Sequence, residues 1–219
     1  MRASRAETGA ALEALGAVAV LRLESPERLR PVVDALIEGG VRAVEVTMTT
    51  TWALESLAEC AAALGDSALL GAGTVLDAET ARMAVSAGAR FVVSPTFCPD
   101  LIRACRRYDV VSIPGAFTPT EIAAAWEAGA DLVKVFPGGL LGPTYIRALR
   151  GPLRHLRLMP TGGVTLDNAG DFLAAGAVAV GVGDALVERG TVERGDYAAI
   201  TERARLLTAV VREAREWAA

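Results

Sequence analysis

The sequence is poor in the residues that cross-link secreted domains or bind transition metals. Only three cysteines occur in 219 residues, and Cys60, Cys98 and Cys105 show no paired spacing. We therefore expect neither a disulfide framework nor a zinc site built from cysteine pairs. His155, the only histidine, lies among arginines in PLRHLRL, which favours a surface position. We predict no metal site, although carboxylates alone remain an alternative set of ligands.

Three further features are missing, and each excludes a class of protein. The apolar runs are too short or too interrupted to span a bilayer, and MRASRAETGA lacks the apolar segment of a secretory signal. A net charge of -4 with scattered arginines gives no basic face for nucleic acid. We expect a cytoplasmic protein that binds neither membranes nor nucleic acid.

Apolar, β-branched runs alternate with segments of helical periodicity along the whole chain. Near-continuous apolar strands between amphipathic helices indicate a parallel sheet whose outer face is covered. We predict one domain over residues 1–219, a single (β/α)8 TIM barrel with an additional N-terminal helix. An open doubly wound sheet is the alternative, but its dinucleotide fingerprint is absent. The eight predicted strands are AVAVLRL, AVEVTM, ALLGAGT, RFVVSP, VVSIPG, LVKVFP, LRLMPTGG and AVAVGVG.

A repeat supports this alternation. EGGVRAVEV, SAGARFVVS, EAGADLVKV and AAGAVAVGV each place a glycine shortly before a strand. We expect Gly40, Gly88, Gly129 and Gly176 to end helices. The segment 197–217 is helical by period and is expected to close the barrel.

Hydroxyl residues followed by proline mark two helix starts. Ser25-Pro26 and Thr118-Pro119 each place a potential capping side chain before a first-turn proline. Glu121 stands three residues after Thr118, which predicts a capping box there.

The chain has 21 arginines but a single lysine, Lys134, in the apolar run DLVKVFPGG. Because side chains alternate along a strand, an inward Lys134 shares its side with Leu132 and Phe136. The same rule places Glu45 and Thr47 inward on AVEVTM. These are the second and sixth strands, which lie opposite one another in a closed ring. We therefore expect Glu45 and Lys134 to approach each other, directly or through a substrate.

This pair suits imine chemistry. An apolar environment favours the neutral amine of a lysine, which can attack a ketone to form a Schiff base. A neighbouring carboxylate can then move the protons of dehydration, bond cleavage and enamine protonation. Arginine could not replace Lys134, because its guanidinium stays protonated and cannot form the imine. The alternative is a buried ion pair without function.

Glycine-rich or proline-containing turns follow most of the predicted strands, at the ends where a barrel carries its active site. Such turns let backbone N–H groups approach an anion, and the seventh and eighth loops commonly bind phosphate. Together they predict a small anionic ligand. The turns are GAGT (71–74), SP (94–95), IPG (113–115), FPGG (136–139), TGGV (161–164) and GVGD (181–184).

In combination these motifs resemble the 2-keto-3-deoxy-6-phosphogluconate (KDPG) and 4-hydroxy-2-oxoglutarate (KHG) aldolase family, which includes phosphogalactonate homologues. The resemblance covers nearly the whole chain. It implies a class I aldolase, a homotrimer that releases pyruvate from 2-oxo acid substrates together with an aldehyde, without metal or cofactor. The motifs are EVT (45–47), GAGTVL (71–76), SP (94–95), IPG (113–115), KVFP (134–137) and PTGGV (160–164).

The resemblance also implies roles for individual residues. Lys134 would form the Schiff base and Glu45 would shuttle protons. Thr74 would hold the pyruvyl carboxylate, and Pro95 and Phe136 would shape the pocket. Gly162 and Gly163 would bind the phosphate end of the substrate.

The carboxylate end departs from the gluconate-type enzymes, whose second strand reads EVT-x-R-T with an arginine on the carboxylate. Here Thr49 stands in that place. Arg22, after the first strand, matches the arginine of the phosphogalactonate branch, and we expect it to grip the carboxylate with two hydrogen bonds. The alternative is that Arg22 pairs with Glu24.

The phosphate end is ambiguous. Thr161 resembles the gluconate type, whereas Arg22 resembles the galactonate type, so the C4 configuration of the substrate stays open. Asp184 follows Gly183 where the family commonly has serine on the phosphate, and a carboxylate beside a dianion is unfavourable. The substrate is expected to be KDPG, with 4-hydroxy-2-oxoglutarate as a second substrate. An unphosphorylated or galacto-configured 2-keto-3-deoxy acid is the alternative.

Three other functions remain open at this stage. A phosphate-binding barrel transferase similar to thiamine-phosphate synthase would use the same loops without an imine. A metal-dependent pyruvate aldolase and a scaffold without catalysis are the other two, and the inward charges of Glu45 and Lys134 disfavour the scaffold.

Overall fold

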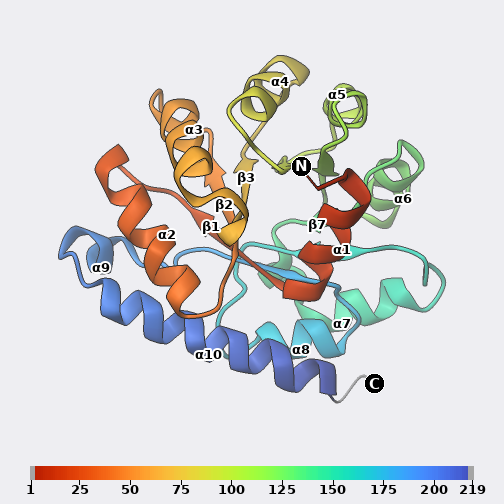
Figure 1. Cartoon of the computed structure of the whole chain (residues 1–219). Helices are drawn as coiled ribbons and strands as arrows, with labels where there is room; N and C mark the ends of the chain where they lie inside the picture. The colour runs from red at the N-terminus through yellow and green to blue at the C-terminus, as the bar shows by residue number, and fades with distance from the viewer. Residues whose placement is uncertain (1–2, 217–219) are drawn as a thin grey trace.

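Short parallel strands form the centre of the molecule, and helices surround them (Figure 1). The computed structural model describes residues 3–216. Each predicted strand run contains a strand, and every strand pair is parallel. The strands are β1 (Ala17–Leu21), β2 (Ala43–Thr47), β3 (Leu69–Gly73), β4 (Phe91–Val93), β5 (Val111–Ile113), β6 (Gly115–Ala116), β7 (Val133–Val135), β8 (Leu158–Pro160) and β9 (Val180–Val182).

The strands form two sheets, with orders β5-β4-β3-β2-β1-β9 and β6-β7-β8. The prediction of eight strands is therefore wrong in one place, because VVSIPG divides at Pro114 into β5 and β6. Proline has no N–H to donate to a ladder, but its carbonyl accepts from the Lys134 N–H at 2.9 Å. A bridge between Thr161 and Gly181 connects the edges formed by β8 and β9.

Helices follow the strands and cover the outer side of both sheets (Figure 1). Near the start of α7, Gly142 has φ 68° and precedes Pro143, so this helix is interrupted by a kink. The helices are α1 (Arg5–Leu15), η1 (Pro26–Arg28), α2 (Leu29–Glu38), α3 (Ala53–Leu64), η2 (Gly65–Ser67), α4 (Ala78–Ser86), α5 (Pro99–Arg107), α6 (Pro119–Glu127), α7 (Gly138–Arg150), α8 (Ala169–Ala174), α9 (Arg189–Glu193) and α10 (Tyr197–Glu216).

The repeated glycines lie where the sequence predicts helix ends. Gly40, Gly88, Gly129 and Gly176 have φ values of 93°, 101°, 96° and 104°. Residues with a side chain rarely adopt this left-handed backbone conformation, which explains why glycine recurs there.

One of the two predicted caps is confirmed. The Thr118 hydroxyl and Glu121 form the capping box at the start of α6. Ser25 stands at the N-cap of η1 with Pro26 as the first residue, as predicted, but its side chain makes no capping hydrogen bond. The Glu27 carboxylate competes for the hydroxyl: its own backbone N–H and then the Ser25 hydroxyl bond to it and lower its pKa. The chain there forms only the short 3-10 turn η1.

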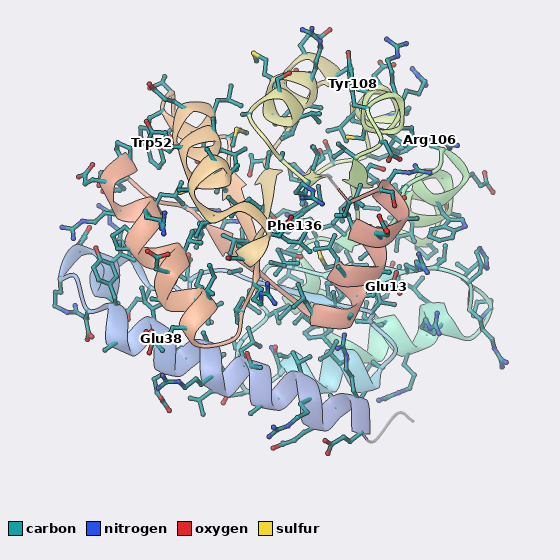
Figure 2. All side chains as sticks on the ribbon, in the orientation of Figure 1. Glu13, Glu38, Trp52, Arg106, Tyr108 and Phe136 are labelled. Atoms are coloured by element: carbon teal, nitrogen blue, oxygen red, sulfur yellow. The ribbon has the colours of Figure 1, made fainter. Side chains whose placement is uncertain are left out.

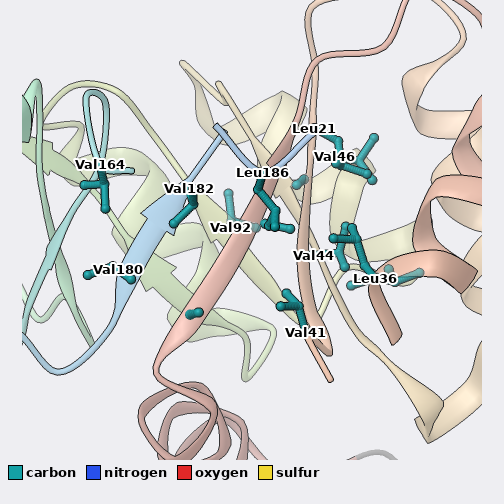
Figure 3. Close-up of a cluster of buried hydrophobic side chains, with 14 of the residues drawn as sticks. Leu21, Leu36, Val41, Val44, Val46, Val92, Val164, Val180, Val182 and Leu186 are labelled. Carbon is teal, nitrogen blue, oxygen red and sulfur yellow. The ribbon is translucent and has the colours of Figure 1, made fainter. Parts of the chain in front are cut away.

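Alternation along the strands divides the core in two. Val44 of β2 and Val133 of β7 belong to the large cluster between strands and helices, part of which is drawn in Figure 3. Ala43 and Leu132, one position away on the same strands, belong to an inner cluster. Leu12 of α1 joins that inner cluster. The predicted N-terminal helix is thus confirmed, and it covers the amino-terminal end of the strands.

The long helix α10 packs across α2 and α8 (Figure 1). The predicted helix 197–217 is confirmed as far as Glu216, and Trp217 lies outside the described residues. Within residues 3–216, no helix combines the length and the hydropathy needed to cross a membrane.

Candidate active site

The two inward charges predicted from the sequence meet inside the molecule. Glu45 comes from the middle of β2 and Lys134 from the middle of β7, and Lys134 Nζ lies 4.0 Å from Glu45 Oε1. The side chains of Glu45 and Lys134 are 0% and 3% exposed. Such a distance allows attraction between charges but is too long for a hydrogen bond. The site therefore buries two titratable groups of opposite charge that are not joined by a hydrogen bond.

The Glu45 carboxylate is unusually poor in partners. Neither of its oxygens has a hydrogen-bond partner among the described residues. Burial raises the pKa of Glu45, and the charges of Lys134 and Arg22 oppose this shift only in part. Gly73 makes room for the carboxyl group, because a Cβ atom there would lie 1.8 Å from Glu45 Oε1. The carboxyl group is thus available to exchange protons with a bound molecule.

Phe136 forms one wall beside the lysine. Lys134 Nζ lies 5.1 Å from the centre of the Phe136 ring, within cation–π range. Figure 2 shows Phe136 inside the ring of helices, whereas Glu38 lies on the outer side. A Cβ atom on Gly162 would come within 2.8 Å of the Phe136 ring. The aromatic ring therefore connects the lysine with the loop after β8.

Three other predicted residues lie at the ends of strands. The Thr47 hydroxyl donates to the Leu21 carbonyl at 2.8 Å, so it fixes the end of β2 to β1. Thr74 follows β3 with φ 56°, a left-handed conformation that is uncommon outside glycine and often marks functional sites. Pro95 follows β4 with its backbone against Gly115, where a Cβ atom would lie 2.3 Å from the Pro95 carbonyl.

A cavity of about 240 Å³ opens between the loops after β8 and β9. Gly162 and Gly163 in the loop after β8 have φ values of 79° and 78°, a backbone conformation that glycine permits. Free N–H groups of successive residues are the usual backbone donors to anions and hydroxyl oxygens. The cavity is lined by Val20, Arg22, Thr161, Gly162, Gly163, Val164, Thr165, Gly183, Asp184 and Ala185.

Arg22 and Asp184 are the charged residues of this cavity, and both are exposed. A Cβ atom on Gly183 would lie 3.2 Å from Arg22 Nη1, so the guanidinium approaches the loop after β9. No ion pair joins Arg22 to Glu24, the nearby acid considered as its alternative partner, and Glu24 instead pairs with Arg189 at 2.6 Å. Arg22 also lines a second cavity, of about 260 Å³, on the side of α9.

The sequence as a whole matches the family model described as KDPG and KHG aldolase over residues 9–203. The chain belongs to this aldolase family. It is therefore an enzyme, a lyase. The match leaves out only short segments at each end.

Individual relatives agree with the family. A 2-dehydro-3-deoxy-phosphogluconate aldolase of Treponema pallidum is 41% identical over 196 residues, which cover 87% of this chain and 91% of the relative. A 2-dehydro-3-deoxy-6-phosphogalactonate aldolase of Escherichia coli is 36% identical, covering 81% and 87%. A KDPG aldolase from Legionella pneumophila, solved with pyruvate captured at low pH as a covalent carbinolamine intermediate, has a TM-score of 0.85 and 28% identity, covering 91% and 97%.

Asn168 supports the loop after β8, a role that the sequence does not reveal. Its Nδ2 donates to the Gly163 carbonyl at 3.0 Å, and its Oδ1 accepts from the Thr165 N–H at 2.8 Å. These bonds hold the loop after β8 in place. Asparagine in a loop is too common for a sequence signal, although its position shortly after TGGV is suggestive.

The remaining predicted feature of the aldolase concerns metal. His155 is exposed and its ring packs edge-on against Trp126, with ring centres 5.9 Å apart. Residues 3–216 contain no group of three or more histidine, cysteine, aspartate or glutamate side chains placed to hold a metal ion.

Proposed function

We propose that this aldolase works by the class I mechanism, with Lys134 as the Schiff-base residue. The observation that carries the proposal is the position of the only lysine, 3% exposed and 4.0 Å from the carboxyl group of Glu45. The amine lies beside the Phe136 ring and the Glu45 carboxyl group, where it can reach the ketone of a bound substrate. The covalent carbinolamine described for the Legionella enzyme supports the same chemistry.

In the proposed reaction, Lys134 Nζ attacks the C2 ketone of a 2-keto-3-deoxy acid, and water leaves to give the iminium. The C4 hydroxyl then loses its proton, the C3–C4 bond breaks, and its electron pair moves to the iminium nitrogen as an enamine. The aldehyde departs. Protonation of C3 and hydrolysis of the imine release pyruvate and return the amine.

Glu45 is the group that we assign to these proton transfers. Its pKa is raised by burial, so it can both hold a proton for the hydroxide that leaves the carbinolamine and accept one from the C4 hydroxyl. The lack of any competing hydrogen bond leaves both oxygens free for the substrate.

At the carboxylate end, we assign the role of the missing arginine to Arg22, whose charge also acts on Glu45. Thr49 cannot supply a charge, and its hydroxyl is already within 3.1 Å of the Thr47 hydroxyl. We expect Thr74 to assist through the unusual backbone turn after β3, while Thr47 braces that end of β2. Arg22→Ala should raise the KM for pyruvate in the condensation direction by about tenfold or more. An unchanged KM would assign the carboxylate to another group, and Arg30→Ala on exposed α2 is the matched control.

Pro95 and Phe136 shape the middle of the pocket, and the loops after β8 and β9 receive the far end of the substrate. The residues that line the cavity there and would contact this end of the substrate are Thr161, Gly162, Gly163, Gly183 and Asp184. The substrate is a six-carbon 2-keto-3-deoxy acid cleaved to pyruvate and a three-carbon aldehyde; with KDPG that aldehyde is glyceraldehyde 3-phosphate. Cleavage of 4-hydroxy-2-oxoglutarate to pyruvate and glyoxylate is a second reaction to assay, and the galacto-configured acid a third.

Borohydride trapping tests the proposal directly. Incubation with pyruvate and borohydride should add one reduced pyruvyl unit, located at Lys134 by peptide mapping. Arg30→Lys supplies the control, since it adds an exposed second lysine that should carry no adduct. A chain that binds pyruvate without any adduct would contradict the imine and favour a phosphate-binding transferase or a metal enolate on the same fold.

We further propose that the two sheets together form one closed (β/α)8 barrel, a single domain over residues 1–219. The Thr161–Gly181 bridge and the Pro114–Lys134 hydrogen bond support closure at the two junctions between the sheets.

We also propose that the protein assembles as a homotrimer, which exposed apolar side chains such as Leu76 and Met83 support. Light scattering should then give a mass three times the 22.7 kDa of one chain. We propose a cytoplasmic location, because the three free cysteines of the chain are compatible with a reducing compartment.

A further inference from the structure

Asp184 lies at the far end of the proposed substrate pocket, on a tight turn after β9. The Gly183 carbonyl accepts from the Leu186 N–H at 2.8 Å and from the Val187 N–H at 3.0 Å, which closes this turn. The Thr161–Gly181 bridge brings it beside the loop after β8. Asp184 thus shares one cavity with Gly162 and Gly163.

The carboxylate of Asp184 has no hydrogen bond or ion pair with any of residues 3–216. A carboxylate is an acceptor only, with room for about four hydrogen bonds. Among the lining residues of the cavity it is the only anionic acceptor, beside the hydroxyl groups of Thr161 and Thr165. A ligand that satisfies the whole cavity must therefore offer a donor as well as acceptors.

The charges of the cavity lead to the same conclusion. Arg22 is its only cationic lining residue and Asp184 its only anionic one. In the proposed function, Arg22 binds the carboxylate at the other end of the substrate. With the guanidinium of Arg22 bound to that carboxylate, the other charged lining residue, Asp184, leaves a net negative charge at the far end.

We propose that Asp184 determines specificity for the far end of the substrate, selecting a free terminal hydroxyl over a terminal phosphate. The inference rests on the proposed aldolase function. A hydroxyl can donate to the Asp184 carboxylate and accept from the loop N–H groups. A phosphate carries close to two negative charges and three acceptor oxygens, so the same carboxylate repels it and receives no hydrogen bond from it.

The test compares kcat/KM for KDPG and for the same acid with an unphosphorylated C6 hydroxyl. We expect the wild-type ratio, phosphorylated over unphosphorylated, to lie below one. Asp184→Asn, which keeps the shape and removes the charge, should raise that ratio about tenfold, as expected for one charge about 5 Å from a dianion in an exposed site. Raising the salt concentration should shrink this difference.

Asp167→Asn is the matched control, because Asp167 is exposed on the loop after β8 but does not line the cavity. An unchanged ratio in Asp184→Asn, or an equal shift in Asp167→Asn, would overturn the assignment. Asp184→Ser gives a second neutral variant if the amide folds poorly. If neither acid yields pyruvate and no adduct forms at Lys134, the aldolase mechanism itself fails, which is distinguishable from a wrong terminus.

Discussion

Asp131 and Lys134 are charged residues three positions apart on one segment, and the protein surrounds them very differently. The Asp131 carboxylate, just before β7, accepts from the Ser112 N–H at 2.9 Å and from its hydroxyl at 3.2 Å, with Arg5 at 3.6 Å. Lys134, within β7, faces Glu45 at 4.0 Å, and the Glu45 oxygens receive no hydrogen bond.

Hydrogen bonding separates the two ends of the strands: the amino-terminal end satisfies its charged side chain, and the carboxyl-terminal half, where we propose the chemistry, does not. Burial raises the pKa of Asp131, and the Ser112 hydrogen bonds and Arg5 offset this shift in part. Burial also raises the pKa of Glu45, where only the charges of Lys134, 4.0 Å away, and Arg22 oppose it. The partly buried Asp131, with its hydrogen bonds, anchors α1 at the amino-terminal end, whereas the Glu45 carboxyl group, without them, is available for a substrate.

The largest effect should follow from Lys134→Arg. Arginine keeps the positive charge but cannot form an imine, so kcat/KM should fall by about 10⁴-fold or more. Pyruvate release followed by a coupled assay measures this. Circular dichroism should show an intact fold, and retained activity would sink the Schiff-base assignment.

Removal of both buried charges sharpens the contrast with Asp131. The double variant Glu45→Gln, Lys134→Met should be inactive yet as stable as the wild type, or more stable by about 1–4 kcal/mol, because it removes two poorly compensated buried charges. Urea unfolding measures the free energy. A double variant clearly less stable than the wild type would mean that the pair contributes to folding after all.

The pH dependence of stability follows from the same shift. Because the folded-state pKa of Glu45 lies above its ordinary value of 4.5, the folded protein binds this proton more tightly than the unfolded chain. Wild-type stability relative to Glu45→Gln should therefore fall as pH rises from 4.5 through the raised pKa. Unfolding curves at a series of pH values would show the trend, and a difference that grows with pH would contradict it.

At the other end, Asp131→Ala should affect folding rather than catalysis. It leaves the Ser112 N–H and hydroxyl without their acceptor, which destabilises the protein by about 1–3 kcal/mol. The kcat of the folded variant should stay unchanged. A stable variant with reduced kcat would break the division between the two ends.

The smallest effect is expected for an ion pair that is neither buried nor near the site. Arg30 and Asp34 lie one turn apart on α2 at 2.8 Å, both about half exposed. Arg30→Ala should lower the unfolding free energy by about 0.3–0.5 kcal/mol. A loss above about 1 kcal/mol would show that this surface ion pair contributes more to stability than exposed pairs usually do.

Much of the fold follows from local sequence pattern. Alternating apolar runs predict the strands, and the period of two correctly separates Leu132 inside from Val133 outside. The predicted strand divides at Pro114 because β5 pairs with β4 whereas β6 pairs with β7. The Ser25 hydroxyl makes no capping bond because it bonds to the Glu27 carboxylate instead. The first is settled by pairing with distant segments, and the second by the side-chain conformation of a residue two positions away.

The site divides in a similar way. Glu45 and Lys134 can be predicted because they are the two charges on inward strand positions. The close fit of Gly73 against Glu45, and the bonds from Asn168 to Gly163 and Thr165, arise between segments distant in sequence or in a loop of variable shape. These contacts could not be read from residue type or spacing.

The N-terminal helix has a consequence for the order of events. Because Leu12 belongs to the inner cluster at the amino-terminal end, we expect a substrate to reach the buried amine of Lys134 from the strand carboxyl ends. A three-carbon fragment tethered to Lys134 would stay behind while the aldehyde leaves, since both would leave by the same end. Turnover should therefore be ordered, with aldehyde first and pyruvate last, and pyruvate should be the product that binds the free enzyme.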